Sequence, residues 1–239
     1  MIIDKKLVIC IFSLPVCNAV LADFRDIPLF IMNAFKQPSV VGAILPCTSG
    51  VGKELTRYMV RSQRVHPEHP LRILEVGAGT GAMTEIIVDH VRDIDQVDVI
   101  EISPEFCSVL HDKFDKYKNV SIHCMSIIDW HSEQAYDFII STLPFNSFDY
   151  ELMDSIINHL TLLIKSGGVL SYVAYAGMAQ LKKTFLWGKK RVDHKRKMKR
   201  LKEWRHQSKI AKKTIIKNVP PINIYHLCIE KNAAIAVSR

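Results

Sequence analysis

"LRILEVGAGTGAMTEIIVDHV", residues 71–91, is the stretch that decides the fold of this chain. Its first residues form an apolar run typical of a buried strand, its middle is rich in glycine, and its end has helical periodicity. The three glycines stand at alternate positions directly after the predicted strand. Glycine lets a backbone turn tightly and approach a ligand, and the helix that follows offers free N–H groups. The stretch therefore predicts a strand, a ligand-binding turn and a helix.

The glycine spacing and two carboxylates indicate what kind of ligand the turn binds. A dinucleotide fingerprint spaces its glycines G-x-G-x-x-G and leaves a helix N-terminus for a pyrophosphate. This chain has G-x-G-x-G with Glu75 two residues before the first glycine, which favours a ligand with an amino-acid end and no phosphate. Glu101 ends the next predicted strand, where a carboxylate can accept both hydroxyls of a ribose. The alternative is that Glu101 only caps the helix after it.

Downstream of this unit, strands and helices alternate. Segments 96–114, 119–130 and 136–148 each contain a predicted strand, and in the first of them Ser103 and Pro104 open a helix as cap and first-turn residue. A helix over 150–168 ends at two glycines, and a fifth strand covers 169–177. This alternation predicts an α/β fold with a doubly wound, mostly parallel, Rossmann-like sheet.

The remaining segments divide the chain. Residues 1–22 form an apolar segment, read either as a secretory signal or as a segment at the membrane interface. Residues 23–69 hold a helix at 23–37 and a second at 52–63, which we expect to form a lid over the substrate and cofactor. Residues 70–239 form the core, with a mostly helical basic insert at 182–217 and two closing extended segments within 218–232.

The charge distribution and the cysteine content limit the kinds of partner and ligand that the sequence predicts. The chain of 239 residues has a net charge of +8, and its 48% hydrophobic and 23% charged content is ordinary for a globular protein. Segment 182–217 holds 16 of the 32 Lys and Arg residues against two acidic ones, so it carries +14 and leaves −6 for the rest. This favours a polyanionic partner, either nucleic acid or an anionic membrane, over a merely solvated helix. The six cysteines have no metal-binding spacing, so we expect reduced thiols and no metal.

On these motifs the chain resembles the class I S-adenosylmethionine-dependent methyltransferases over residues 70–175. The resemblance implies S-adenosyl-L-methionine as cofactor and a set of residues around it. It implies that the methionine moiety lies against Glu75, Gly77, Gly79 and Gly81, and that the ribose lies against Glu101 with Ile102 beside it. It also implies that Ser126 and Ile127 flank the adenine, and that Leu143 and Pro144 lie next to the transferred methyl group. Because this donor is a cytosolic metabolite, we favour a cytoplasmic protein that keeps residues 1–22.

Three further stretches narrow the resemblance. Residues 35–55, residues 218–227 and the Ser-x-Leu-Pro-Phe corner at 141–145 are similar to those of bacterial phospholipid N-methyltransferases. This resemblance implies methylation of phosphatidylethanolamine toward phosphatidylcholine by an enzyme peripheral to the inner face of the membrane. The helix at 23–37 has as many acidic as basic residues, so we assign docking on anionic lipid to segment 182–217 as well.

The corner itself indicates the acceptor. Enzymes that methylate a base amine usually place Asn or Asp two residues before the Pro, whereas Ser141 and Thr142 offer only hydroxyls. We expect these hydroxyls to accept from a lipid amine or to orient a phosphate oxygen. Tyr58 is a candidate for head-group contact, with core packing as its alternative. We expect His131, His194 and His226 to be surface or structural residues.

Two alternatives remain open. The ribosomal RNA adenine dimethylases share the motif order, and here Phe145 could stack a base while segment 182–217, with Trp187 and Trp204, could bind RNA. Their corner usually begins with Asn, which this chain lacks. The third reading, a methyltransferase-fold protein without chemistry, is disfavoured by the intact glycines and Glu101.

Overall fold

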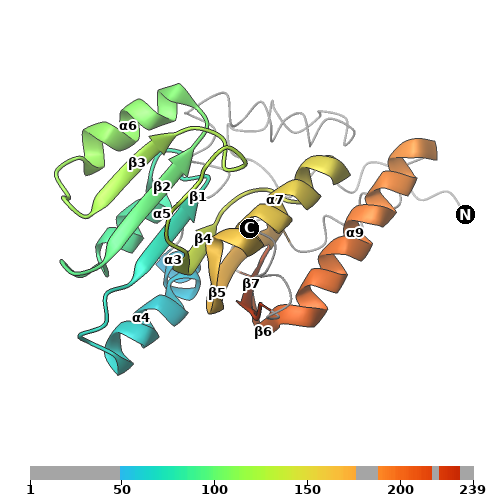
Figure 1. Ribbon diagram of the computed structural model, residues 1–239. Helices are drawn as coiled ribbons and strands as arrows, with labels where there is room; N and C mark the ends of the chain where they lie inside the picture. The colour runs from blue at the N-terminus through green and yellow to red at the C-terminus, as the bar shows by residue number, and fades with distance from the viewer. Residues whose placement is uncertain (1–48, 176–187, 217–220, 232–239) are drawn as a thin grey trace, which may run out of the picture.

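The computed structural model describes residues 49–175, 188–216 and 221–231 (Figure 1). The segment predicted at 1–22, the helix predicted at 23–37, most of the stretch at 35–55 and the start of the basic insert lie outside these ranges. The described residues form one sheet with helices on both faces.

The sheet has seven strands in the order β3-β2-β1-β4-β5-β7-β6. The first five strands along the chain are parallel, β7 is antiparallel to β5, and β6 is antiparallel to β7. This confirms the doubly wound, mostly parallel, Rossmann-like fold. The bounds are β1 (Arg72–Val76), β2 (Gln96–Glu101), β3 (Val120–Cys124), β4 (Tyr136–Ser141), β5 (Ile164–Tyr175), β6 (Lys209–Ile215) and β7 (Ile222–Ile229).

The helices cover the two faces of the sheet (Figure 1). One apolar core joins the sheet to α3 (Ser49–Leu55), α4 (Arg57–Val65), α5 (Ala82–Val88) and α6 (Pro104–Phe114). The core on the other face joins it to α7 (Tyr150–Leu163) and α9 (Gly188–Ser208). Because both faces are covered, the central strands β1 and β4 are buried at all but one residue each and are mostly apolar in sequence.

Local signals explain where several helices begin and end. Pro104 is the first residue of α6 and Ser103 occupies its N-cap position, although the Ser103 side chain makes no capping hydrogen bond. Asp149 caps α7, since its carboxylate accepts a hydrogen bond from the Leu152 amide at 2.8 Å. The helix expected over 150–168 ends earlier, at Leu163, because the apolar residue Ile164 already pairs with β4. The glycines at 167 and 168 therefore lie inside β5.

The second half of the basic insert differs from its expected helical form. Helix α9 ends at Ser208, and the next seven residues form β6 at the edge of the sheet. The closing extended pair is thus β6 with β7, and only β7 lies within 218–232. Lysines on an exposed edge strand discourage pairing with another chain, which suits this placement of Lys209, Lys212 and Lys213.

Two cysteines are also placed differently from the expectation. Cys107 of α6 and Cys124 at the end of β3 form a disulfide bond, so the prediction of reduced thiols is wrong for this pair. The parallel register sets Cys124 opposite Glu101, and α6 begins just after Glu101, which brings the two residues together despite their separation in sequence. Cys228 is free, and the other three cysteines lie outside the described ranges.

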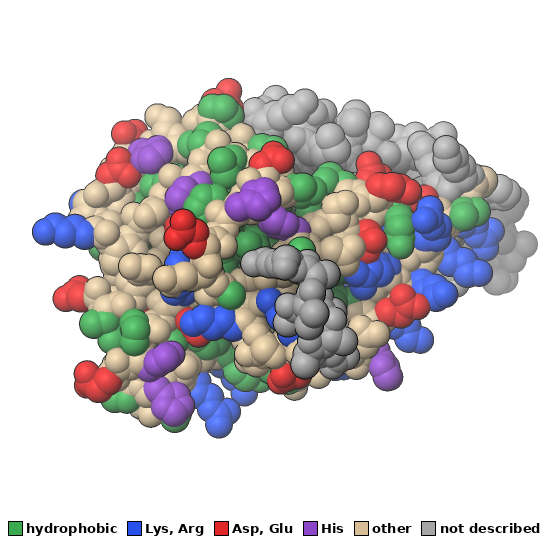
Figure 2. Space-filling model, viewed as in Figure 1, with side chains coloured by type: hydrophobic (Ala, Val, Ile, Leu, Met, Phe, Trp, Pro, Cys, Tyr) green, Lys and Arg blue, Asp and Glu red, His purple; other side chains and the backbone are tan. Residues whose placement is uncertain are grey.

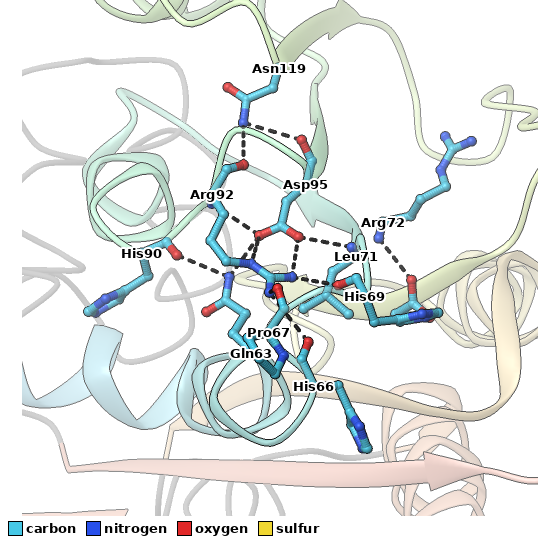
Figure 3. A network of polar contacts seen from close by, with 11 residues as sticks. Gln63, His66, Pro67, His69, Leu71, Arg72, His90, Arg92, Asp95 and Asn119 are labelled. Atoms are coloured by element: carbon cyan, nitrogen blue, oxygen red, sulfur yellow. Dashed lines mark hydrogen bonds and ion pairs between the residues drawn. The ribbon is translucent and has the colours of Figure 1, made fainter.

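A buried polar network holds the opposite, amino-terminal end of the sheet (Figure 3). Asp95, which is 0% exposed, accepts hydrogen bonds from the Leu71 amide at 2.9 Å, from the Gln63 amide group at 2.9 Å and from Arg92. Arg92 in turn donates to backbone carbonyls of the linker between α4 and β1. The network therefore fixes α4 to the start of β1 and β2.

Candidate active site

The glycine turn lies at the carboxyl end of β1, where parallel α/β sheets bind ligands. All three glycines have positive φ, with 80° at Gly77, 59° at Gly79 and 90° at Gly81. A Cβ at Gly77 would lie 2.9 Å from the Leu143 side chain, and one at Gly81 would lie 2.5 Å from the Phe114 ring. Both the backbone conformation and the packing of Leu143 and Phe114 therefore require glycine at these positions, and close approach of a ligand to the turn stays a prediction.

Glu101 ties the glycine turn to the next strand. Its carboxylate accepts hydrogen bonds from the backbone amides of Gly79 at 2.7 Å, and of Ile102 and Ser103 at 2.9 Å each. A carboxylate offers about four acceptor positions, so one position stays available for a ribose hydroxyl. The Ser103 amide belongs to the N-cap residue of α6, so the alternative that Glu101 only caps this helix and the ribose assignment both remain predictions.

Two exposed apolar side chains flank Glu101. Ile102 is 69% exposed and Met125 is 38% exposed, and the Met125 amide donates to the Glu101 carbonyl at 3.0 Å. Exposed apolar groups beside a buried carboxylate suit the flat face of an adenine next to its ribose. Met125 was not singled out in the sequence, where its only signal is its position directly after β3.

The two residues predicted to flank the adenine, Ser126 and Ile127, differ in their exposure and in their contacts. The Ser126 hydroxyl accepts a hydrogen bond from the Ile128 amide at 3.3 Å and so shapes the loop after β3. The Ile127 side chain is 6% exposed and packs in the core on the α7 face. Both assignments remain predictions, with Ser126 the more accessible of the two.

Glu75 is a fully buried carboxylate without a partner. Neither of its oxygens, nor the nearby Thr84 hydroxyl, makes a hydrogen bond of good geometry within the described part of the chain. Burial raises the pKa of Glu75 to about 8; the Thr84 hydroxyl opposes this rise, and the negative charge of Glu101 adds to it. An orphaned buried carboxylate beside a glycine turn fits a cationic ligand, because a positive charge would supply the missing partner.

The acceptor corner follows β4 and is held by local hydrogen bonds. The Thr142 amide donates to the Val76 carbonyl at 3.1 Å, and the Thr142 hydroxyl donates to the Gly77 carbonyl at 2.5 Å. The Ser141 hydroxyl accepts from the Leu143 amide at 3.3 Å, and Ser141 is 0% exposed. Leu143 and Pro144 are partly exposed. Both hydroxyls thus have partners within the chain and shape the corner itself.

Phe145 is buried in a cluster of aromatic rings. It is 2% exposed, and its ring centroid lies 5.3 Å from that of Tyr172 and 5.9 Å from that of Trp204. Trp204 of α9 is itself buried and stacks on Tyr172 at 5.3 Å. Neither ring therefore presents a free face for stacking a base. Trp187 lies outside the described residues.

Tyr58 lies on the other face of the sheet, beside a buried histidine. Its ring centroid is 4.8 Å from that of His226, which is 0% exposed and bonds to the Ser171 hydroxyl at 2.8 Å through Nδ1. Tyr58 also packs against the apolar core beneath α3 and α4. Burial lowers the pKa of His226, against the opposing effect of Glu54. This favours packing for Tyr58, and head-group contact remains a prediction.

Helix α9 divides its positive charges between two sides. Lys197 bonds to the loop between β4 and α7, Arg205 bonds to Tyr172 of β5, and Arg200 forms an ion pair with Asp154 of α7. Among the residues of the insert whose side chains the structure describes, the exposed cations are Arg191, Lys195, Arg196, Lys199 and Lys202 on α9, and Lys209, Lys212 and Lys213 on β6. Figure 2 shows Lys and Arg side chains gathered over α9, at the right of the view, with a few acidic side chains between them.

The described part of the chain has neither a metal-type cluster nor a membrane-spanning helix. No group of three or more His, Cys, Asp or Glu side chains is placed to hold a metal ion in residues 49–175, 188–216 and 221–231. No helix in these ranges is both long enough and apolar enough to cross a bilayer.

Comparison with known proteins shows that the core is similar to methyltransferases. Residues 73–168 match the family model described as a methyltransferase domain. The chain is 26% identical over 155 residues to an ornithine lipid N-methyltransferase of Singulisphaera acidiphila, covering 62% of this chain and 78% of that protein. It is 29% identical over 128 residues to a malonyl-[acyl-carrier protein] O-methyltransferase of Acetivibrio thermocellus, covering 54% of this chain but only 44% of that protein.

Other relatives and solved structures match over smaller or larger shares of the chain. The ribosomal RNA small subunit methyltransferase A of Sulfurimonas denitrificans is 33% identical over 86 residues, covering 33% of this chain and 30% of that protein. Among solved structures, the N-methyltransferase NodS of Bradyrhizobium japonicum in complex with S-adenosyl-L-homocysteine superposes with a TM-score of 0.53 at 13% identity, covering 74% of this chain and 88% of that one. At that identity the likeness concerns the fold.

Proposed function

We propose that this protein, which carries a class I S-adenosylmethionine-dependent methyltransferase domain, methylates the amine of a phospholipid head group at an anionic membrane surface. S-adenosylmethionine is the cofactor of the domain. The acceptor we infer is phosphatidylethanolamine, converted stepwise toward phosphatidylcholine. N-methylation, the lipid acceptor and the membrane surface are the proposed parts.

The residues at the carboxyl edge of the sheet fit this cofactor. When bound, S-adenosylmethionine supplies a methyl group on a positively charged sulfur. The unpartnered Glu75 carboxylate suits the cationic methionine end, and the three glycines beside it carry no side chain that would keep a ligand from their backbone. The remaining acceptor position of Glu101 suits a ribose hydroxyl, and Ile102 and Met125 suit the adenine. We assign Ser126 to the edge of the same pocket.

The burial of Phe145 is the observation that carries the choice of acceptor. An exocyclic base amine is planar and a poor nucleophile, so its enzymes stack the base on an aromatic ring and hold the amine with Asn or Asp. Here Phe145 is buried with its ring against both Tyr172 and Trp204, and the corner offers hydroxyls. A primary alkyl amine needs only to lose its ammonium proton and to be aligned in a dry pocket.

The roles of the corner residues follow from their contacts. Ser141 and Thr142 hold the shape of the corner through hydrogen bonds to Leu143 and Gly77. Leu143 packs toward Gly77, so the partly exposed Leu143 and Pro144 are the residues we place next to the transferred methyl. In this proposal the proton of the ammonium acceptor leaves to water.

The relatives support a lipid acceptor over RNA. The protein named for methylating ornithine lipid aligns over 62% of this chain, whereas the ribosomal RNA methyltransferase aligns over 33%. The longer alignment includes more than the cofactor-binding core, which all of these enzymes share. Coverage therefore favours the lipid relative even though its identity of 26% is lower than 33%.

The exposed cations of α9 and β6 support docking on an anionic surface. A basic residue near such a surface contributes roughly 1 kcal/mol of binding free energy. Cations on one side of α9, such as Lys195 and Lys202, can act together with those of β6. In this proposal the protein is cytoplasmic and peripheral to the inner face of the membrane.

Methylation of an adenine in ribosomal RNA is the second candidate. It is favoured by the RNA methyltransferase relatives and by the same basic side chains, which could bind phosphates. The Asn or Asp expected before the corner proline is absent, and that counts against it.

A labelling experiment tests both candidates together. The purified protein is incubated with methyl-labelled S-adenosylmethionine and either phosphatidylethanolamine in anionic vesicles or undermethylated ribosomal RNA. Label in the lipid phase is the expected result. Label in the RNA alone would overturn the lipid proposal.

A further inference from the structure

Lys197 of α9 reaches the far end of the acceptor corner, which here means the whole connection over residues 141–148 from the end of β4 to α7. Its ammonium donates a hydrogen bond to the Phe148 carbonyl at 2.7 Å and lies 3.2 Å from the Asp193 carboxylate. Lys197 is only 9% exposed, whereas lysines are rarely buried unless their charge is paired. Its burial is thus tied to a specific contact with the loop between β4 and α7.

This contact restrains the end of the acceptor corner. The corner passes from Pro144 to Phe148 and then enters α7 at Asp149, which caps that helix. Hydrogen bonds at Thr142 fix the first half of the corner to the glycine turn. In the second half, the Phe145 ring packs in the aromatic cluster, and the Phe148 carbonyl accepts a hydrogen bond from Lys197. The corner is therefore fixed from both sides.

The same face of α9 carries a second anchor. Trp204 follows Lys197 by two helical turns and so lies on the same side of the helix. It packs on Phe145 and Tyr172, while Arg205 donates to the Tyr172 hydroxyl at 2.6 Å. Burial raises the pKa of Tyr172 to about 12, against the opposing effect of Arg205, so this hydroxyl stays neutral.

A helix that only supplied charge to a surface would turn its cations outward. In α9, however, Lys197 bonds to the corner, Arg200 forms an ion pair with Asp154, and Arg205 bonds to β5. Helix α9 of the basic insert therefore packs against the acceptor corner and β5 on one side, and exposes cations on the other. Figure 1 shows α9 running alongside α7, the helix into which the corner leads.

We infer that Lys197 is a positioning residue for the methyl acceptor. It acts through the Phe148 carbonyl, by holding the corner in the conformation that aligns the acceptor with the methyl donor. The inference rests on the proposed function in one respect, namely that the corner at 141–148 receives the acceptor. It adds a role for the inner face of α9, which the charge of the insert does not imply.

Methylation kinetics of Lys197→Met test the inference. Phosphatidylethanolamine is presented in micelles of neutral detergent, so that the loss of one positive charge does not alter surface binding. We expect kcat to fall about tenfold, because a small misplacement of the acceptor is costly, while the affinity for S-adenosylmethionine stays within about twofold of wild type. The matched control Lys118→Met removes an exposed lysine far from the corner and should leave kcat unchanged.

A second readout does not depend on the acceptor. Hydrogen exchange of the amides at 145–149 should be faster in Lys197→Met than in Lys118→Met, and Lys197→Arg should restore both exchange and kcat in part. If wild type does not methylate the lipid but exchange in the corner still responds, the proposed function fails and the contact stands. Equal kcat and equal exchange in the two methionine variants would overturn the inference. So would a parallel loss of cofactor affinity, which would mean that Lys197 serves only general stability.

Discussion

The Thr142 hydroxyl donates a hydrogen bond of 2.5 Å to the carbonyl of Gly77, which joins the acceptor corner directly to the glycine turn. The Thr142 amide strengthens this connection through the Val76 carbonyl at 3.1 Å. The two loops come from adjacent parallel strands, since Val76 and Ser141 are partners in the sheet. One side chain thus couples the part of the site assigned to the methyl donor with the part assigned to the acceptor.

Thr142→Val should lower activity more than it lowers stability. Valine keeps the shape of threonine but leaves the Gly77 carbonyl without its partner, which costs about 1 kcal/mol in the free energy of unfolding. We expect kcat to fall about tenfold through misalignment of donor and acceptor. The measurement is steady-state methylation together with thermal unfolding. Thr142→Ser keeps the hydroxyl and should retain most activity, and an equal loss in both variants would contradict a role for the hydrogen bond.

Much of the fold was accessible from sequence because it depends on short-range patterns. The apolar runs, the alternating glycines and the Ser103-Pro104 start of α6 each fix a local conformation, and alternation of strand and helix fixes the sheet topology. The carboxylates at 75 and 101 could be singled out as candidates for the same reason, since they stand near the ends of β1 and β2 beside the glycine turn.

The rest depended on contacts between distant segments. The disulfide between Cys107 and Cys124 follows from the register of β2 with β3, which no local pattern reveals. The burial of Phe145 requires Trp204 from the basic insert, where high charge predicts exposure. Likewise, β6 becomes a strand because β7 pairs with it, although its sequence, KIAKKTI, reads as a continuation of a basic helix.

Glu101→Gln should weaken cofactor binding. A glutamine keeps one acceptor oxygen but replaces the other with a donor that faces backbone amides. Hydrogen bonds to a charged group are worth about 1.5–3 kcal/mol, so we expect the dissociation constant of S-adenosylmethionine to rise roughly tenfold to a hundredfold. Titration calorimetry measures this change. The control Glu105→Gln removes an exposed carboxylate from the first turn of α6, close to Glu101 in sequence, and should leave the affinity unchanged. An unchanged affinity in Glu101→Gln would contradict the ribose assignment.

Glu75 should make cofactor affinity depend on pH. Its pKa of about 8 means that the carboxyl is mostly protonated below that pH, and a bound cation favours its ionised form. Binding therefore releases a proton below pH 8, and affinity should rise as pH increases from 6 to 8. In Glu75→Gln this contribution should disappear, leaving a weaker and flatter dependence. Identical pH profiles for the two proteins, measured by calorimetry, would exclude Glu75 from the cationic subsite.

Glu75 should also make the stability of the cofactor-free protein depend on pH. Because the folded-state pKa of Glu75 is raised above its ordinary value of 4.5, its neutral form contributes stability that is fully present below pH 4.5 and lost as pH rises through 8. Glu75→Gln stays neutral throughout and should lose less stability than wild type between pH 6 and 9. Denaturant unfolding at several pH values tests this, and a steeper loss in the variant would contradict the burial of an uncompensated carboxylate.

The exposed cations of α9 should govern binding to anionic vesicles. Charge reversal in the double variant Lys195→Glu and Lys202→Glu should weaken vesicle binding at least tenfold at low salt, given about 1 kcal/mol per basic residue near the surface. The difference should shrink as salt screens the charges. Sedimentation with vesicles measures it. The matched double variant Lys116→Glu and Lys118→Glu changes the same net charge beyond α6 and should bind nearly as wild type. Equal losses in both would mean that net charge alone drives the association.

Asp95→Asn should destabilise the end of the sheet that lies opposite the active site (Figure 3). Burial opposes ionisation of Asp95, but hydrogen bonds from Arg92, the Leu71 amide and Gln63 outweigh it and lower its pKa. A lowered pKa gives stability that is present above the ordinary value of 3.8 and is lost as pH falls through the folded-state value.

We therefore expect Asp95→Asn to lose about 2 kcal/mol in the free energy of unfolding at pH 7, since it weakens several charge-assisted hydrogen bonds. The difference from wild type should narrow as acid protonates Asp95 in the native protein. Cofactor affinity should not change, because the network lies at the amino-terminal end of the strands. Asp93→Asn, which alters an exposed carboxylate two residues away, should match wild type in urea unfolding. A gap between Asp95→Asn and wild type that stays constant from pH 7 to pH 3 would show that packing, and not the charge of Asp95, sustains the network.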